Sequence, residues 1–333
     1  MKDHRIPLGI KTGWATGELA TAVYIGITMA FFLFYLTEVL FISPAWAGTA
    51  ILIPRLWDAI TDPFMGLISD RTKTRIGRRR PYLLVGSILF GIGFWLLLSP
   101  PEGLTEFQNV MYFSVMYIFV GTAFTIYDVP FSSMAAEMTD DYKERTTLIG
   151  FKMISARSGI VLAAYVSPII YLSTDNLKDG FALLGLIGGV FITVMGFIAF
   201  FSTKNAKMVQ PKNTNTSFKE INPFIQTKEL VQNKPFARLF SLFMLQNLAI
   251  GASASTLIYF IINILKVDQS FIGTLFTLGA VVSLLVTPIW VVISQKIGKK
   301  KAFGIAILIV AVVMIAAFFL NSNYFYLIFV LYV

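Results

Sequence analysis

The chain has 333 residues, of which 56% are hydrophobic, 15% aromatic and 14% charged, with a net charge of +9. Its mean hydropathy of +0.74 excludes both a soluble globular domain and a disordered chain, because each of these needs more charge. The absence of cysteine excludes disulfides and thiolate metal sites, and one histidine, His4, gives no basis for histidine catalysis. We therefore expect neither an enzyme nor a bound cofactor.

Nine long apolar stretches and the start of a tenth follow one another along the chain. Each complete stretch has about the 20 residues that a helix needs to cross the hydrocarbon core of a bilayer. The pattern predicts an all-α polytopic membrane protein. The stretches are residues 13–37, 46–68, 81–99, 107–129, 149–172, 181–202, 239–265, 271–293, 302–320, and 324 onward.

Basic residues alternate between the connections of these stretches. The N-terminus and every second connection hold 22 of the 27 Lys and Arg residues, whereas the opposite connections hold only Lys178 and Lys266. By the positive-inside rule, the N-terminus lies in the cytoplasm and the chain crosses the plasma (inner) membrane several times. The net positive charge thus reports orientation among membrane lipids, and we expect no nucleic-acid partner.

A short internal sequence repeat suggests two related halves. The run Ile76–Tyr82 (IGRRRPY) returns 221 residues and six spans later as Ile297–Phe303 (IGKKKAF). A polar stretch, residues 203–238, separates the sixth span from the seventh. We expect the major facilitator fold of two six-helix halves. The expected domains are an N-terminal bundle 1–202, a cytoplasmic linker 203–238 and a truncated C-terminal bundle 239–333.

Charged residues inside the second predicted span point to a cation site. Asp58 and Asp62 are spaced i, i+4 on one helix face, and Arg55 lies on the same stripe. Two carboxylates at bilayer depth repel each other unless a proton or a metal ion lies between them. Na⁺, Li⁺ or H⁺ fits such a pair, with Thr61 and Thr125 adding hydroxyl oxygens. The alternative is an ion-pair network that only holds helices together.

A second set of polar residues in the spans predicts a substrate site. Glu18 and Asp128 carry carboxylates that accept hydrogen bonds from the hydroxyls of a sugar, and Lys152 donates to a hydroxyl or carboxylate. Arg55 and the ring of Tyr24 are further candidates. The alternatives are ordinary packing for the aromatic ring and a place in the cytoplasmic interface for Lys152.

The basic connection after the second span predicts a conformational latch. Its charged residues can pair with acidic residues or span ends nearby and hold one conformation on the cytoplasmic side. The residues of this gate are Asp70, Arg71, Gly77, Arg78, Arg79 and Arg80.

Two long motifs resemble those of a known family. The run Arg55–Pro63 (RLWDAITDP) and the run Asp128–Thr146 (DVPFSSMAAEMTDDYKERT) are similar to the signatures of the glycoside–pentoside–hexuronide:cation symporters, related to melibiose permease, in the major facilitator superfamily. The resemblance implies that Asp58, Asp62 and Thr125 bind the coupling cation.

The same resemblance implies roles in sugar binding and also shows departures. It matches Glu18, Asp128 and Lys152 to sugar ligands. Thr61 replaces an Asn of the cation site in melibiose permease, Ser132 replaces a sugar-stacking Trp, and Glu18 replaces an Asp. The first departure leaves Na⁺ and H⁺ both open, and the other two argue against melibiose itself as the substrate.

The leading functional hypothesis is cation-coupled symport of a sugar or glycoside by alternating access, by a monomer. A second hypothesis is transport of a lysophospholipid or another amphipathic solute, because Ser132 leaves room where a Trp is expected. A third is a membrane receptor or scaffold that transports nothing, against which the paired carboxylates argue. The substrate, the choice between Na⁺ and H⁺, and the stoichiometry stay open.

Overall fold

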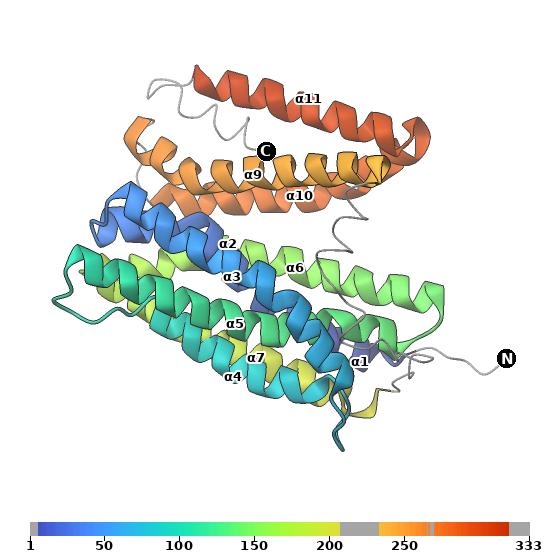
Figure 1. Ribbon diagram of the computed structural model, residues 1–333. Coiled ribbons are helices and arrows are strands. Elements are labelled where there is room, and N and C mark those ends of the chain that lie inside the picture. The colour runs from blue at the N-terminus through green and yellow to red at the C-terminus, as the bar shows by residue number, and fades with distance from the viewer. Residues whose placement is uncertain (1–5, 207–232, 265, 267–269, 320–333) are drawn as a thin grey trace.

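The computed structural model describes residues 6–206, 233–264, 266 and 270–319, and the regular elements of this part are all helices (Figure 1). The first group is α1 (Leu8–Ala15), α2 (Gly17–Phe34), the π-helix η1 (Tyr35–Val39), α3 (Pro44–Arg71), α4 (Arg80–Leu97), α5 (Glu106–Met138), α6 (Tyr142–Tyr171) and α7 (Leu177–Ser202). The 3-10 helix η2 (Thr203–Asn205) continues α7. The second group is α9 (Lys234–Tyr259), the π-helix η3 (Phe260–Ile264), α10 (Ser270–Ile297) and α11 (Lys299–Phe318). The predicted all-α class is confirmed.

Six helical segments of the described chain are long and apolar enough to cross a membrane. α3 is not among these six, since its middle carries Arg55, Asp58 and Asp62. Large apolar side chains stand exposed along α6, α9 and α11, which suits surfaces that face lipid and not water. The six segments are Leu8–Val39, Arg80–Leu97, Glu106–Met138, Glu144–Tyr171, Leu177–Asn205 and Lys234–Ile264.

The observed helices extend beyond the predicted apolar stretches. α5 continues through Pro130 to Met138, although its predicted span ends at residue 129. A proline costs a helix one backbone hydrogen bond, which tertiary packing offsets here. α9 begins at Lys234, inside the predicted linker. The linker residues 207–232 and the predicted tenth span lie outside the described residues.

α4 packs against both α5 and α7 within the first group. α4 and α7 approach closely at Gly91 and Gly189, where a Cβ on Gly91 would overlap the Gly189 carbonyl and the Thr193 hydroxyl. Small residues let membrane helices meet backbone to backbone in this way. Aromatic rings fill the adjoining core; for example, the ring centroids of Tyr24 and Phe90 are 5.0 Å apart.

α9, α10 and α11 lie together beyond α2 and α6 (Figure 1). α9 packs along α2, and α10 packs along α6. In the first group, α2 packs on α6 and α3 packs on α5. These pairings bring polar residues of α2, α3, α5 and α6 within reach of one another.

Candidate functional site

The paired carboxylates of α3 face α5. The Thr125 hydroxyl on α5 donates to Asp62 Oδ1 over 2.7 Å. Arg55 Nη1 lies 3.7 Å from Asp58 Oδ2, and 49% of the Arg55 side chain is exposed. The structure therefore joins Asp62 to Thr125 by a short hydrogen bond and leaves Arg55 only loosely paired with Asp58.

Asp58 keeps an oxygen available within this pair. Its Oδ1 is buried and accepts no hydrogen bond from the described residues. Thr61 does not supply one, because its hydroxyl donates to the carbonyls of Trp57 (3.2 Å) and Asp58 (3.4 Å) on its own helix. The structure thus brings together Asp58, Asp62 and Thr125 but not Thr61.

These donors suit a small hard cation or a proton. Two carboxylates and a hydroxyl offer only oxygen ligands, which hard cations prefer. Within the described ranges, no group of three or more His, Cys, Asp or Glu side chains lies close enough to hold a metal ion. A divalent metal centre built from such residues is therefore not seen there.

A second polar cluster joins α2, α5 and α6. Lys152 Nζ of α6 donates to Ser132 Oγ over 2.7 Å and lies 3.3 Å from Glu18 Oε2. The Ser132 hydroxyl reaches Asp128 Oδ1 at 3.5 Å. Lys152 also stands 5.4 Å above the ring of Phe131. Glu18 Oε2 is buried and, despite the ion pair, accepts no hydrogen bond from the residues described. Glu18 thus meets Lys152 as an ion pair, whereas the buried Asp58 Oδ1 of the first cluster accepts no hydrogen bond from the described residues.

α5 contributes to both clusters. Thr125 binds Asp62, and Asp128, three residues later, belongs to the Glu18–Lys152 cluster. Residues spaced i, i+3 are neighbours on a helix surface. Pro130 follows at once and removes a backbone hydrogen bond from α5 at this level. A shift of this one turn of helix therefore moves ligands of both clusters.

Two predicted substrate residues lie elsewhere. Tyr24 is buried in the core with 2% of its surface exposed, edge-on to Phe90 and in contact with Phe124 at 5.5 Å. Arg55 stands 5.5 Å from the ring centroid of Tyr117 and beside Asp58. Neither residue joins the Glu18–Lys152 cluster in this conformation.

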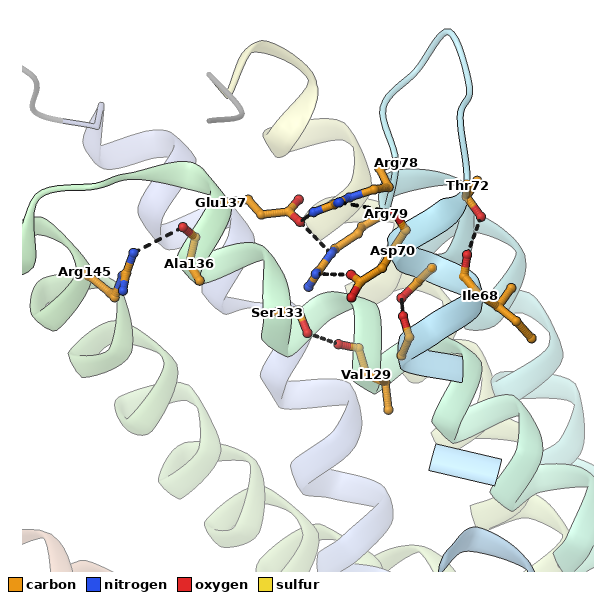
Figure 2. A network of polar contacts seen from close by, with 12 residues as sticks. Ile68, Asp70, Thr72, Arg78, Arg79, Val129, Ser133, Ala136, Glu137 and Arg145 are labelled. Carbon is orange, nitrogen blue, oxygen red and sulfur yellow. Dashed lines mark hydrogen bonds and ion pairs between the residues drawn. The ribbon is translucent and has the colours of Figure 1, made fainter. Parts of the chain in front are cut away.

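The predicted latch forms a charge network at one end of the bundle (Figure 2). Arg79 Nη2 lies 2.6 Å from Asp70 Oδ1, and Arg79 Nε lies 2.8 Å from Glu137 Oε1 of α5. Arg78 pairs with the same Glu137 oxygen and donates to the Asp70 carbonyl at 3.2 Å. Arg145 donates to the Ala136 carbonyl and so caps the end of α5.

The other latch residues have separate roles. Gly77 has φ +107°, a left-handed conformation that lets the connection turn back toward α4. Arg80 donates to the Phe200 carbonyl over 2.9 Å and stacks over the Phe200 ring at 4.6 Å, which ties α4 to α7. Arg71 is exposed at the end of α3.

Two acidic residues of this end were not assigned a role from the sequence. Glu137 is the shared partner of Arg78 and Arg79. Glu144 pairs with Lys11 at 2.7 Å and accepts a hydrogen bond from the Ile6 amide at 3.4 Å. Both lie in the second motif, between residues 128 and 146, so the signal in the sequence was the motif itself. Helix packing decides which basic side chain pairs with each of these two acidic residues.

Known proteins agree with this architecture. The family described as "MFS/sugar transport protein" matches residues 13–333. The uncharacterized symporter YnaJ of Bacillus subtilis (strain 168) is 28% identical over 334 residues, covering 98% of this chain and 70% of YnaJ. The isoprimeverose transporter of Lactiplantibacillus pentosus is 26% identical over 314 residues, covering 92% of this chain and 63% of the relative. The chain thus spans about two thirds of the length of these relatives.

A solved structure supports the fold. The crystal structure of a POT family transporter in complex with a thioalcohol-conjugated peptide has a TM-score of 0.65 at 17% identity, covering 98% of this chain and 80% of that one. The likeness at this identity concerns the fold alone. The family match over residues 13–333, with the apolar helices and the two motifs, shows that this integral multi-pass membrane protein belongs to the glycoside–pentoside–hexuronide:cation symporter family of the major facilitator superfamily, a family of transporters and not of enzymes.

Proposed function

We propose that this protein is a symporter that couples the entry of Na⁺ or H⁺ to the import of a sugar or glycoside. The observation that carries the proposal is the double use of α5. This helix gives Thr125 to the Asp62 carboxylate and, one turn later, Asp128 to the Glu18–Lys152 cluster. When a cation site and a substrate site share one helical turn, binding at one site can change the affinity of the other.

The two clusters have complementary tasks in this scheme. The coupling cation binds between Asp58 and Asp62, where it offsets the repulsion of the two carboxylates. A polyhydroxylated substrate donates to Glu18 and Asp128 and accepts from Lys152. Lys152 and Ser132 are hydrogen-bonded to each other and together present a donor and a hydroxyl to the substrate, which favours a ligand with several hydroxyls. Coupling is then a reciprocal free energy between the two sites.

The proposal includes an orientation. The Arg78–Glu137–Arg79 network and the N-terminus face the cytoplasm, and the protein works as a monomer in the plasma membrane. The alternation of basic connections supports this orientation. The isoprimeverose transporter among the relatives supports a glycoside as the class of substrate.

Uptake into membrane vesicles tests the coupling. The parent protein should accumulate one of a panel of labelled pentosides, hexosides and hexuronides when a Na⁺ or pH gradient is imposed. Thr125→Ala should reduce this accumulation severalfold, because Asp62 loses its hydroxyl partner. Thr122→Ala is the matched control, since its hydroxyl instead accepts from Trp57 Nε1 at 2.9 Å.

The other outcomes separate the alternatives. The coupling scheme would be overturned if accumulation of the substrate depended on neither gradient. It would also be overturned if Thr125→Ala and Thr122→Ala accumulated the substrate equally. If the protein took up a lysophospholipid but none of the sugars, the substrate would be an amphipathic lipid and not a sugar or glycoside. Binding without uptake in any arm would favour a receptor.

A further inference from the structure

The helices α2 and α9 both end in a π-helix. α2 passes into η1, Tyr35–Val39, and α9 passes into η3, Phe260–Ile264. π-helices are rare and occur mostly as short segments at functional sites, because the wider turn weakens the regular backbone ladder. Two such ends, each five residues long, face each other across the two groups of helices.

A direct hydrogen bond joins these two ends. The hydroxyl oxygens of Thr37 and Tyr259 lie 2.5 Å apart. Because the Thr37 hydroxyl also donates to the Leu33 carbonyl at 3.2 Å, its oxygen is the acceptor and Tyr259 is the donor. The ring of Tyr259 also contacts that of Phe34, with centroids 6.5 Å apart. The Thr37–Tyr259 hydrogen bond links residues 222 positions apart in the chain.

The two sides of the contact are held differently. On the η1 side, Tyr35 stacks on Phe181 of α7 at 4.4 Å and donates its hydroxyl to the Leu98 carbonyl at 3.2 Å. On the other side, the α9 surface carries many exposed apolar side chains, among them Leu245 and Leu248. A small pocket adjoins the contact and is lined by Phe34, Glu38, Leu177, Tyr259, Ile262 and Asn263. η1 is thus fixed to its bundle by stacking and a hydrogen bond, whereas the end of α9 meets it beside the small pocket, with Ile258 and Ile261 buried.

We propose that the Thr37–Tyr259 hydrogen bond is a latch that ties η1 to the end of α9 and helps to hold the pathway closed at the end opposite the basic network. The role of this latch in a transport cycle rests on the proposed function. The experiment that tests the latch does not depend on transport. A single neutral hydrogen bond suits a latch that has to open in every cycle, since its loss shifts a two-state equilibrium only on the order of fivefold.

Cysteine labelling measures the opening directly, because the chain has no cysteine of its own. The reporter is Ala30→Cys, which precedes Thr37 by seven residues and so lies on nearly the same face of α2, roughly 10 Å deeper. A membrane-impermeant maleimide is added to oriented vesicles from each side in turn. Neither a substrate nor an ion gradient is needed, so failure of the symport proposal leaves this test intact.

Removing either hydroxyl should speed labelling of Ala30→Cys about fivefold from the side opposite the basic network. The two variants are Tyr259→Phe and Thr37→Val, and their combination should label no faster than either alone, because both delete one bond. Thr37→Ser should restore the slow rate. Tyr165→Phe, at a half-exposed tyrosine of α6, is the matched control and should leave the rate unchanged.

Several results would overturn the latch. These are equal labelling rates in Tyr259→Phe and the parent reporter, effects of the two single variants that multiply in the double variant, or acceleration from the side of the basic network. Absence of labelling in every variant would show that this latch does not hold the pathway closed.

Discussion

Gly121 of α5 stands against the carboxylate of Asp58 on α3, so closely that a Cβ on Gly121 would lie 2.6 Å from Asp58 Oδ1. Only a glycine leaves this carboxylate in place beside Asp62. Gly121→Ala should therefore push Asp58 away from the pair. The carboxylate is the far end of a flexible side chain, so the fold should tolerate the shift. We expect the affinity for Na⁺, Li⁺ or H⁺ to fall about tenfold, which corresponds to about 1.4 kcal/mol of binding free energy.

Cation titration of the purified protein, followed by its melting temperature, measures the effect of Gly121→Ala. Gly66→Ala on α3 is the matched control, because its added Cβ would lie at an ordinary 3.9 Å from Val129. If both variants bound the cation as the parent does, Asp58 would not be part of the cation site.

Ser132 bridges Lys152 and Asp128, and its removal should weaken substrate binding. Ser132→Ala leaves Lys152 with Glu18 alone and strengthens the Lys152–Glu18 pairing that a substrate must displace. We expect the apparent substrate affinity to fall roughly three- to tenfold, as for one lost hydrogen bond. The measurement is the substrate dependence of uptake, or of the melting temperature, at a saturating cation concentration.

The adjacent Ser133→Ala provides the control for Ser132→Ala. The Ser133 hydroxyl donates to the Val129 carbonyl of its own helix at 2.8 Å and contacts no member of the cluster. Equal affinities in the two variants would remove Ser132 from the substrate site.

The arrangement of spans could be predicted from the sequence because lipid imposes a length and a composition on each helix. The i, i+4 spacing of Asp58 and Asp62 likewise fixed their common face. Contacts between helices needed more: the family resemblance implied that Thr125 joins the pair, and the structure shows its hydrogen bond to Asp62.

The sequence could not resolve how individual side chains are used. A hydroxyl such as that of Thr61 always has its own helix carbonyls as alternative partners. In a membrane helix that is apolar all round, the pattern also cannot separate a core ring such as Tyr24 from one that lines a pathway. Glu137 lies in a recognised motif, but its two arginine partners lie 58 and 59 residues away in the chain. Only the packing of the helices brings them to Glu137.

Loss of the Glu137 charge should destabilise the bundle. Glu137→Gln leaves Arg78 and Arg79 without their shared partner in a region where all three side chains are mostly buried. Breaking a buried ion pair from one side costs roughly 3–5 kcal/mol, and partial exposure lowers this figure. We expect a melting temperature several degrees lower, measured in detergent. Glu102→Gln, at an exposed acid in the α4–α5 connection, should melt as the parent does; an equal loss there would assign the effect to net charge.

The orientation of the basic network is open to a direct measurement. Lys73 and Glu102 are both exposed, in the connections at opposite ends of α4. Because the chain contains no cysteine, Lys73→Cys and Glu102→Cys each create one unique thiol. An impermeant maleimide added to intact cells should label Glu102→Cys and should reach Lys73→Cys only after permeabilisation, since basic connections stay in the cytoplasm. The two variants control for each other, because α4 crosses the membrane once between them. Labelling of Lys73→Cys on intact cells would invert the orientation and place the Arg78–Glu137–Arg79 network on the outside.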